Sequence, residues 1–175
     1  MHGNASAKDA LRKEMRENLR ALTPTEVGEA STRIRSQLSF KHGERVALFA
    51  GLPTEPQLLA LIAEFPGTSW HLPRVTGKST MEFVQVDSTT ILRRGPFGIL
   101  EPQQRTTATS FDTILCPGIA FTKEGARLGQ GGGFYDRYLH GQQGAHLIGI
   151  AFQCQLVESL PRDEHDLSMH EIVTS

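Results

Sequence analysis

Residues 46–50 read Val-Ala-Leu-Phe-Ala, an unbroken apolar run that ends at Gly51 and Pro53. A short apolar run bounded by glycine and proline predicts a strand buried on both faces, as in parallel sheets covered by helices. Two later runs have the same character, at 114–116 and 147–152. Weaker strand patterns lie at 69–72 and 81–86. The chain is therefore expected to build a mainly parallel sheet.

Two amphipathic helices are predicted ahead of the first strand. Ser6 with Asp9 matches a capping box, and Thr23 with Glu26 forms a second one around Pro24. Apolar residues then recur at helical spacing: Leu11, Met15, Leu19 and Leu22 in the first helix, and Val27, Ala30, Ile34 and Leu38 in the second. Helices interleaved with buried strands favour an α/β fold, with helices on both faces of the sheet, and we expect one domain over residues 1–175.

Composition excludes several classes of protein. The 175 residues carry 18 Lys and Arg against 19 Asp and Glu, so no overall charge draws the chain to nucleic acid or to an anionic membrane. No apolar run approaches the ~18 residues of a membrane span, and the basic first twenty residues contain no apolar signal core. Cys116 and Cys154 lack disulfide or metal-ligand spacing and are expected to be buried free thiols. We expect a soluble cytoplasmic monomer.

The segment at 125–139, Gly-Ala-Arg-Leu-Gly-Gln-Gly-Gly-Gly-Phe-Tyr-Asp-Arg-Tyr-Leu, concentrates glycine between two buried strands. Glycines let backbone N–H groups approach a phosphate, and a helix opening at Phe134 would add more donors. Arg127 offers a donor fork for phosphate oxygens, and Asp136 offers an oxygen ligand for Mg²⁺. The segment lacks the Lys-Ser or Lys-Thr of a P-loop. The alternative is a flexible loop in which Arg127 and Asp136 pair with other surface charges.

Glu55 follows the carboxyl end of the first buried strand, where ligands collect in open α/β sheets. An acidic residue at that place indicates a ligand contact. The alternative is local, because residues 54–56 could begin the next helix and place Glu55 at its positive end. Position alone does not separate the two interpretations.

Two further charged groups carry open interpretations. Lys8 and Arg12 lie one helical turn apart and could jointly face an anion, or form part of a solvated charged face. Asp163, Glu164, His165 and Asp166 cluster near the C-terminus and could hold a metal, or be a solvated loop.

Several motifs together resemble the signature of the 5-formyltetrahydrofolate cyclo-ligase family. They are 117–121, 125–129 and 131–137, supported by Lys8, Arg12, 72–75, 95–99, 101–102 and 165–166. The resemblance implies a compact three-layer α/β fold in which ATP and a reduced folate meet in one cleft with Mg²⁺. It covers nearly the whole chain.

The resemblance also implies roles for individual residues. The ATP-binding positions would be Lys8, Arg12, Arg127, Leu128, Gly129, Gln130, Gly131, Gly132, Gly133, Phe134 and Tyr135. The folate-contacting positions would be Glu55, Gln130, Gly131, Gly132, Gly133 and Phe134. Asp136 and Asp166 would bind the metal, and the catalytic set would be Arg127, Tyr135 and Asp136.

The implied reaction converts 5-formyltetrahydrofolate to 5,10-methenyltetrahydrofolate and consumes ATP. ATP phosphorylates the formyl oxygen, the folate nitrogen at position 10 attacks the activated carbon, and phosphate leaves. The sequence departs from the family pattern at Gly132, where lysine is frequent, at Phe134, where tyrosine is common, and at Pro56. Two alternatives are a non-catalytic folate- or nucleotide-binding module with this fold and an ATP-using enzyme that acts on another small amide.

Overall fold

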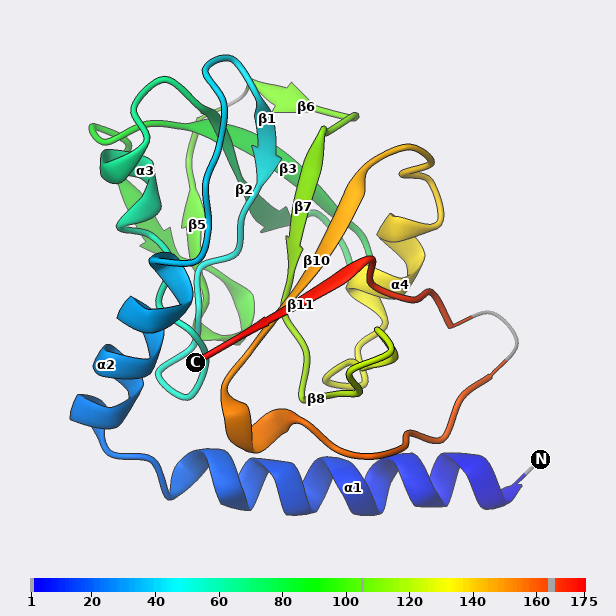
Figure 1. Ribbon diagram of the computed structural model, residues 1–175. Coiled ribbons are helices and arrows are strands. Elements are labelled where there is room, and N and C mark those ends of the chain that lie inside the picture. Colours follow the sequence, from blue (N-terminus) through cyan, green and yellow to red (C-terminus); the bar gives the residue numbers. More distant parts are fainter. Residues whose placement is uncertain (1, 105, 164–165) are drawn as a thin grey trace.

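The computed structural model describes residues 2–104, 106–163 and 166–175. Its main sheet has seven strands in the order β11-β10-β7-β1-β2-β3-β6 (Figure 1). The strands from β11 to β2 run parallel, and β3 and β6 continue the sheet antiparallel. Their bounds are β1 Arg45–Ala47, β2 Ser69–Val75, β3 Met81–Val86, β6 Thr107–Ala108, β7 Thr113–Cys116, β10 His146–Ala151 and β11 Glu171–Thr174. The mainly parallel sheet expected from the apolar runs is confirmed.

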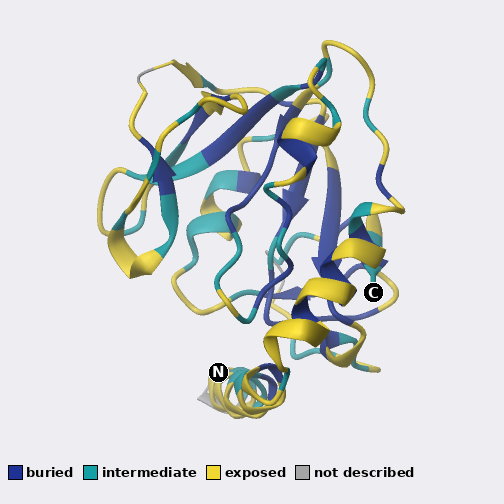
Figure 2. Cartoon of the chain, turned by 90° about the vertical axis from the view of Figure 1, so that its left-hand side faces the viewer, coloured by how far each residue is buried: buried dark blue, intermediate teal, exposed yellow. Residues whose placement is uncertain are grey.

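Helices cover both faces of this sheet. The helices are α1 His2–Arg20, α2 Pro24–Arg35, α3 Leu61–Glu64 and α4 Phe134–Leu139. Alternate strand residues point to opposite faces, so Val46 packs in the core that contains Ile34 of α2, and Ala47 packs with Leu139 of α4. Figure 2 shows this arrangement as buried strands inside helices whose outer faces are exposed. The three-layer α/β fold is confirmed.

Two small antiparallel pairs lie outside the main sheet. β4 (Leu92–Arg94) pairs with β5 (Leu100–Pro102) across the 3₁₀ turn η1 (Pro96–Gly98). β8 (Ala120–Phe121) pairs with β9 (Arg127–Leu128), and a second 3₁₀ turn, η2 (Gln153–Gln155), follows β10. These pairs bring the 95–101 and 127–136 segments to the same side of the sheet, where both line one cavity.

The sequence located some element boundaries and missed others. The Thr23 capping box is confirmed, because Thr23 Oγ1 accepts from the Glu26 N–H at 3.2 Å and Glu26 Oε2 accepts from the Thr23 N–H at 2.7 Å. The capping box at Ser6 is wrong, because α1 already begins at His2. β1 ends at Ala47 because the chain after Leu48 turns toward the cavity, which Phe49 and Ala50 line.

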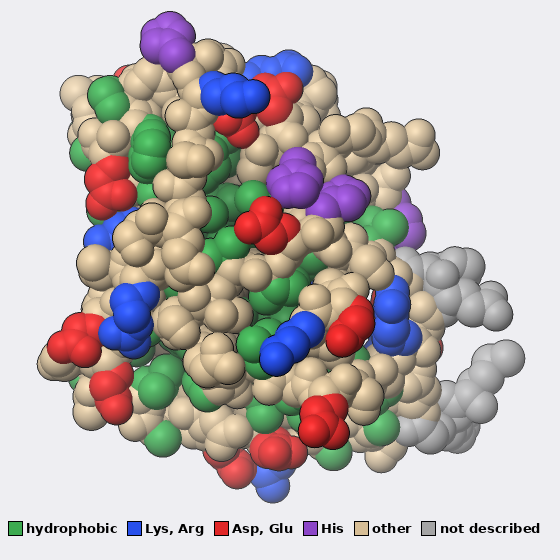
Figure 3. All heavy atoms as spheres, viewed as in Figure 1, with side chains coloured by type: hydrophobic (Ala, Val, Ile, Leu, Met, Phe, Trp, Pro, Cys, Tyr) green, Lys and Arg blue, Asp and Glu red, His purple; other side chains and the backbone are tan. Residues whose placement is uncertain are grey.

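The helices, the surface charges and the two cysteines can each be compared with what the sequence predicted. No helix in the described ranges is long and apolar enough to cross a membrane. On the face shown in Figure 3, acidic and basic side chains are interspersed among apolar ones. Cys116 is buried as expected, whereas Cys154 is exposed, so the prediction of two buried thiols is wrong. Cys154 lies in η2, a surface turn beyond the end of β10.

Candidate functional site

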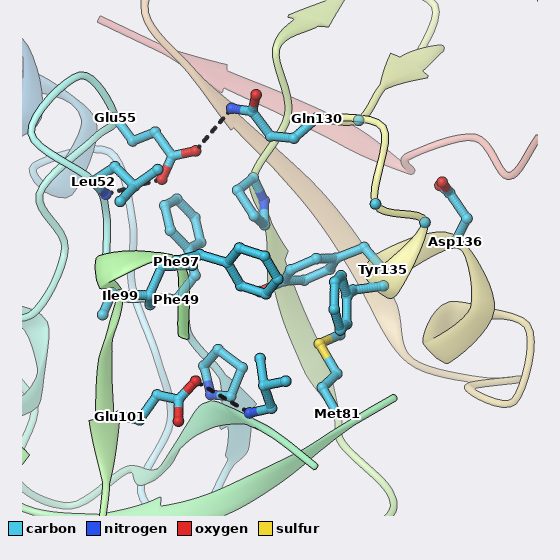
Figure 4. A pocket seen from close by; sticks show the side chains of 18 of the residues that line it. Phe49, Leu52, Glu55, Met81, Phe97, Ile99, Glu101, Gln130, Tyr135 and Asp136 are labelled. Atoms are coloured by element: carbon cyan, nitrogen blue, oxygen red, sulfur yellow. Dashed lines mark hydrogen bonds between the residues drawn. The ribbon is translucent and has the colours of Figure 1, made fainter. Parts of the chain in front are cut away.

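A cavity of about 370 Å³ opens beside the end of β1. Its walls come from the loop after β1, from β2 and β3, from the β4–β5 hairpin and from residues 127–136 (Figure 4). Most of the lining is apolar: Phe49, Ala50, Leu52, Pro73, Val75, Met81, Phe97, Ile99, Pro117, Phe134 and Tyr135. An apolar cavity with a few polar groups is typical of a site for a small organic ligand.

Glu55 lies in the wall of this cavity with 7% of its surface exposed. Its Oε2 accepts from the Leu52 N–H at 2.9 Å, and its Oε1 accepts from Gln130 Nε2 at 3.2 Å. Burial raises the pKa of Glu55, and these two hydrogen bonds oppose the rise. The helix-start interpretation is wrong, because α3 begins only at Leu61.

Residues 129–133, which we call the glycine loop, form the neighbouring wall. Within the described part of the chain, none of their backbone N–H groups donates a hydrogen bond. Gly131 has φ +105° and Gly133 has φ +65°, conformations that favour glycine. Free N–H groups on such a backbone suit an anion. α4 is only six residues long, so the loop rather than the helix dipole supplies most of the donors.

Arg127 and Asp136 form an ion pair at the edge of the cavity. The Arg127 side chain is 3% exposed, and its Nη1 also donates to the Pro117 carbonyl at 3.0 Å. The Asp136 side chain is 51% exposed. The two residues pair with each other in the cavity wall, so the interpretation that they pair with other surface charges is wrong.

Tyr135 lies under Arg127, with the guanidinium carbon 5.9 Å from the ring centroid. Its hydroxyl is buried and has no hydrogen-bond partner among the described residues. Burial raises the pKa of Tyr135 well above its ordinary value, so the hydroxyl stays protonated. A buried O–H without a partner is costly.

Helix α1 reaches the glycine loop through arginines. Arg12 Nε donates to the Gly129 carbonyl at 3.0 Å, and Arg16 Nη2 donates to the Gln130 carbonyl at 2.9 Å. Lys8 Nζ instead contacts Asp163 Oδ2 and Asp166 Oδ2, both at 2.8 Å. The solvated-face interpretation is wrong for Lys8 and Arg12, whose side chains are 12% and 18% exposed.

Residues 4–175 match the model of the 5-formyltetrahydrofolate cyclo-ligase family. The chain belongs to this family. The 5-formyltetrahydrofolate cyclo-ligase of Haemophilus influenzae is 31% identical over 97% of this chain and 98% of its own length. The NMR structure of Aquifex aeolicus 5,10-methenyltetrahydrofolate synthetase superposes with a TM-score of 0.85 at 34% identity, over 95% of this chain and 89% of that one. The corresponding protein of Mycoplasma pneumoniae gives 0.76 at 25% identity, over 95% and 97%.

The two metal positions expected from the cyclo-ligase resemblance, Asp136 and Asp166, are each paired with a cation, Arg127 and Lys8 respectively. Burial raises the pKa of Asp166. Hydrogen bonds from Lys8 and from the Asp163 N–H together lower this pKa by more than burial raises it, so the net shift is downward. Glu164 and His165 lie outside the described residues. Within those residues no group of three or more His, Cys, Asp or Glu side chains is placed to hold a metal. Separate carboxylates fit Mg²⁺ that arrives with nucleotide phosphates, because this ion keeps waters and needs few protein ligands.

The positions expected to bind ligand at 128–134 do not all face the cavity. Gly129, Gln130, Gly132, Gly133 and Phe134 line it. Leu128 is buried in the apolar core and Gly131 is exposed, and neither lines the cavity.

Three further residues in or beside this candidate site were not predicted from the sequence. Arg16 continues the Lys8 and Arg12 face at four-residue spacing, and that spacing was an available signal. Glu101 is 5% exposed and lines the cavity, as does Phe97. Phe97 has φ +65°, is 68% exposed and packs edge-on against Phe134 at 5.8 Å between ring centroids. Nothing local in the sequence predicts that the hairpin turns these two side chains to the cavity.

Proposed function

We propose that this chain uses ATP and Mg²⁺ to convert 5-formyltetrahydrofolate to 5,10-methenyltetrahydrofolate, releasing ADP and phosphate. The observation that carries the proposal is that Glu55 and the glycine loop meet in one apolar cavity and are joined there by Gln130. The first group suits the N–H donors of a folate ring, and the second suits phosphate. The reaction requires both kinds of ligand side by side.

The size of the cavity limits what it holds. About 370 Å³ lies near the lower end of ligand pockets, which run from about 300 to 1,000 Å³. That space suits the ring system of the folate with its formyl group. The nucleoside of ATP and the glutamate tail of the folate would therefore extend over the surface beyond the cavity.

Each wall has a separate task in this reaction. Glu55 offers carboxylate oxygens to the amino and ring N–H groups of the folate, while the apolar walls hold the ring. The free N–H groups of the glycine loop receive the phosphoryl group that moves to the formyl oxygen. Tyr135 lies against Arg127 in the cavity wall, with the guanidinium carbon 5.9 Å from its ring centroid. Phe97 at the exposed edge helps to exclude water from the activated formyl carbon.

Asp136 and Asp166 are the residues that would hold Mg²⁺. When bound, the ion neutralises phosphate charge during phosphoryl transfer. Release of Asp136 from Arg127 would leave the guanidinium available for a phosphate oxygen. All these groups belong to one chain, and we propose that the monomer is sufficient for activity.

The test is an absorbance assay for the methenyl product with purified chain, 5-formyltetrahydrofolate and MgATP. Controls omit ATP or the metal ion. Product that needs both supports the proposal. Folate binding without product or ATP consumption would replace it with a non-catalytic binding module, and ATP consumption that 5-formyltetrahydrofolate does not stimulate would indicate another amide substrate.

A further inference from the structure

Glu101 is a second buried carboxylate in the cavity wall, supplied by β5 rather than by the loop that carries Glu55. Figure 4 shows the two side chains on different sides of the cavity, with Phe49 and Phe97 between them in this view. Within the described residues, the Glu101 carboxylate accepts one hydrogen bond, from the Val75 N–H to Oε1 at 3.2 Å. Oε2 accepts no hydrogen bond from these residues and lies beside Gly95.

The backbone beside Glu101 leaves room for this carboxylate. A Cβ added to Gly95 would lie 2.2 Å from Glu101 Cδ and 2.4 Å from Oε2. Gly95 has φ −91°, which any residue adopts, so the position needs glycine for space and not for conformation. The hairpin thus accommodates the acid tightly and holds it in place.

The charge of the cavity is unbalanced. Its charged lining residues are Glu55, Glu101, Asp136 and Arg127, and the one cation is paired with Asp136. Arg93 lies opposite Glu101 in the β4–β5 register but is exposed, and no ion pair joins them among the described residues. A buried carboxylate without a counter-charge is costly unless a ligand supplies one.

The proposed reaction creates such a positive charge. The substrate carries a neutral N-formyl group, phosphorylation of its oxygen places a positive charge on the N–C unit, and the N–C–N unit of the product shares that charge. In the cyclisation step the bond from carbon to the nitrogen at position 10 forms, and the bond from carbon to the phosphorylated oxygen breaks. The released phosphate takes up the proton of that nitrogen, so atoms and charge balance.

We propose that Glu101 faces this N–C–N unit and stabilises the positive charge that arises when the formyl oxygen is phosphorylated and that the cyclised product retains. The inference rests on the proposed function and adds a residue to it. Glu55 already holds two protein hydrogen bonds and suits recognition of the folate ring, whereas the Glu101 carboxylate lines the cavity with one protein hydrogen bond among the described residues. A fixed charge near the reacting atoms of a low-dielectric site favours the charged transition state over the neutral substrate.

Glu101→Gln is the main test because it removes the charge and little else. The glutamine oxygen can still accept from the Val75 N–H, so the melting temperature should change little. Glu101→Asp keeps the charge but draws it back from the cavity, and an intermediate effect is expected. Glu64→Gln is the matched control, since Glu64 forms an ion pair with Arg35 at 3.2 Å and does not line the cavity.

Two readouts separate charge stabilisation from general binding. For Glu101→Gln, kcat should fall about 10- to 100-fold, while KM for 5-formyltetrahydrofolate changes less than about threefold. In mildly acidic buffer, where the methenyl compound persists, binding of this cationic product should weaken at least about tenfold more than binding of the neutral substrate. The control variant should change neither value.

Either of two results would overturn the inference. One is a Glu101→Gln enzyme with kcat within about threefold of wild type. The other is equal weakening of substrate and product, which would make Glu101 a simple hydrogen-bond acceptor. Failure of the proposed function gives a different result, because the folded wild-type chain itself would then form no methenyl product.

Discussion

The side-chain amide of Gln130 donates to Oε1 of Glu55 at 3.2 Å, and this hydrogen bond joins two positions 75 residues apart. It connects the acidic wall of the cavity to the glycine loop. The same Gln130 accepts from Arg16 of α1 through its carbonyl at 2.9 Å. Helix α1, the glycine loop and Glu55 are therefore one connected unit, and displacement of any one should disturb the others.

Glu55→Gln should separate activity from stability. Loss of the carboxylate should lower kcat/KM for 5-formyltetrahydrofolate about 100-fold, because one of the two acceptors for the folate N–H groups becomes an NH₂ donor. Burial raises the folded-state pKa of Glu55 above its ordinary value of 4.5, so the folded protein binds this proton more tightly than the unfolded chain. The free energy of unfolding therefore falls as the pH rises from the unfolded-state pKa through the folded-state pKa.

The Glu55→Gln variant has no titrating group at this position and does not lose stability in this way as the pH rises. Its melting temperature relative to wild type should therefore rise as the pH increases above about 4.5, the ordinary pKa of this side chain, and thermal scans at a series of pH values measure the difference. A difference that stays constant with pH would show that Glu55 titrates alike in the folded and unfolded chain.

Gly131→Ala tests the glycine loop against Gly144→Ala. Both glycines have positive φ, +105° and +101°, so both variants should lose about 1–2 kcal/mol of unfolding free energy. Only Gly131 lies in the loop whose N–H groups are free, so only its variant should also raise KM for ATP, by roughly tenfold or more. Equal kinetics in the two variants would remove the loop from the nucleotide site.

Asp136→Asn should abolish turnover, at least about 100-fold in kcat, while the fold is kept. The side chain is half-exposed, and its one ion pair is with Arg127. Asp112→Asn is the control, because Asp112 is equally exposed and lies near Arg45, away from the cavity. Initial rates against Mg²⁺ concentration measure the effect. An Asp136 variant with a normal metal response would exclude this carboxylate as a ligand.

Lys8→Ala should lower both the melting temperature and the affinity for ATP. Lys8 holds Asp163 and Asp166 from a mostly buried position, so about 1 kcal/mol or a shift of about 2–4 °C is expected. Lys13→Ala on the exposed side of α1 is the matched control. Calorimetry and ATP titration give the two values. A drop in melting temperature with unchanged ATP affinity would leave Lys8 as a structural clamp only.

The two cysteines should differ in reactivity. Burial raises the pKa of Cys116 to about 12, and partial burial also raises the pKa of Cys154, but only Cys154 is exposed at the surface. A thiol reagent at mildly alkaline pH should therefore modify one residue in the folded chain and two after denaturation. Cys154→Ser should remove the labelling of the folded state. Mass spectrometry of tryptic peptides identifies the modified residue, and labelling of Cys116 in native protein would contradict its burial.

The sequence by itself determined the class of fold and the chemistry of one loop. Apolar runs at 46–50, 114–116 and 147–152 predicted the three central parallel strands, because burial on both faces excludes polar residues from the strand itself. Thr23 with Glu26 predicted the start of α2, because a capping box needs only neighbours three residues apart. Family membership followed from the motifs around the glycine loop.

Only the tertiary structure decided which charged groups meet. Lys8 contacts Asp166 across a separation of 158 residues, and Glu55 contacts Gln130 across 75. Glu101 reaches the cavity only because the β4–β5 hairpin packs beside β2 and because Gly95 leaves it space. Local patterns report hydrophobic periodicity and caps, whereas the partner of a buried charge depends on how distant segments pack, and no short stretch of sequence contains that information.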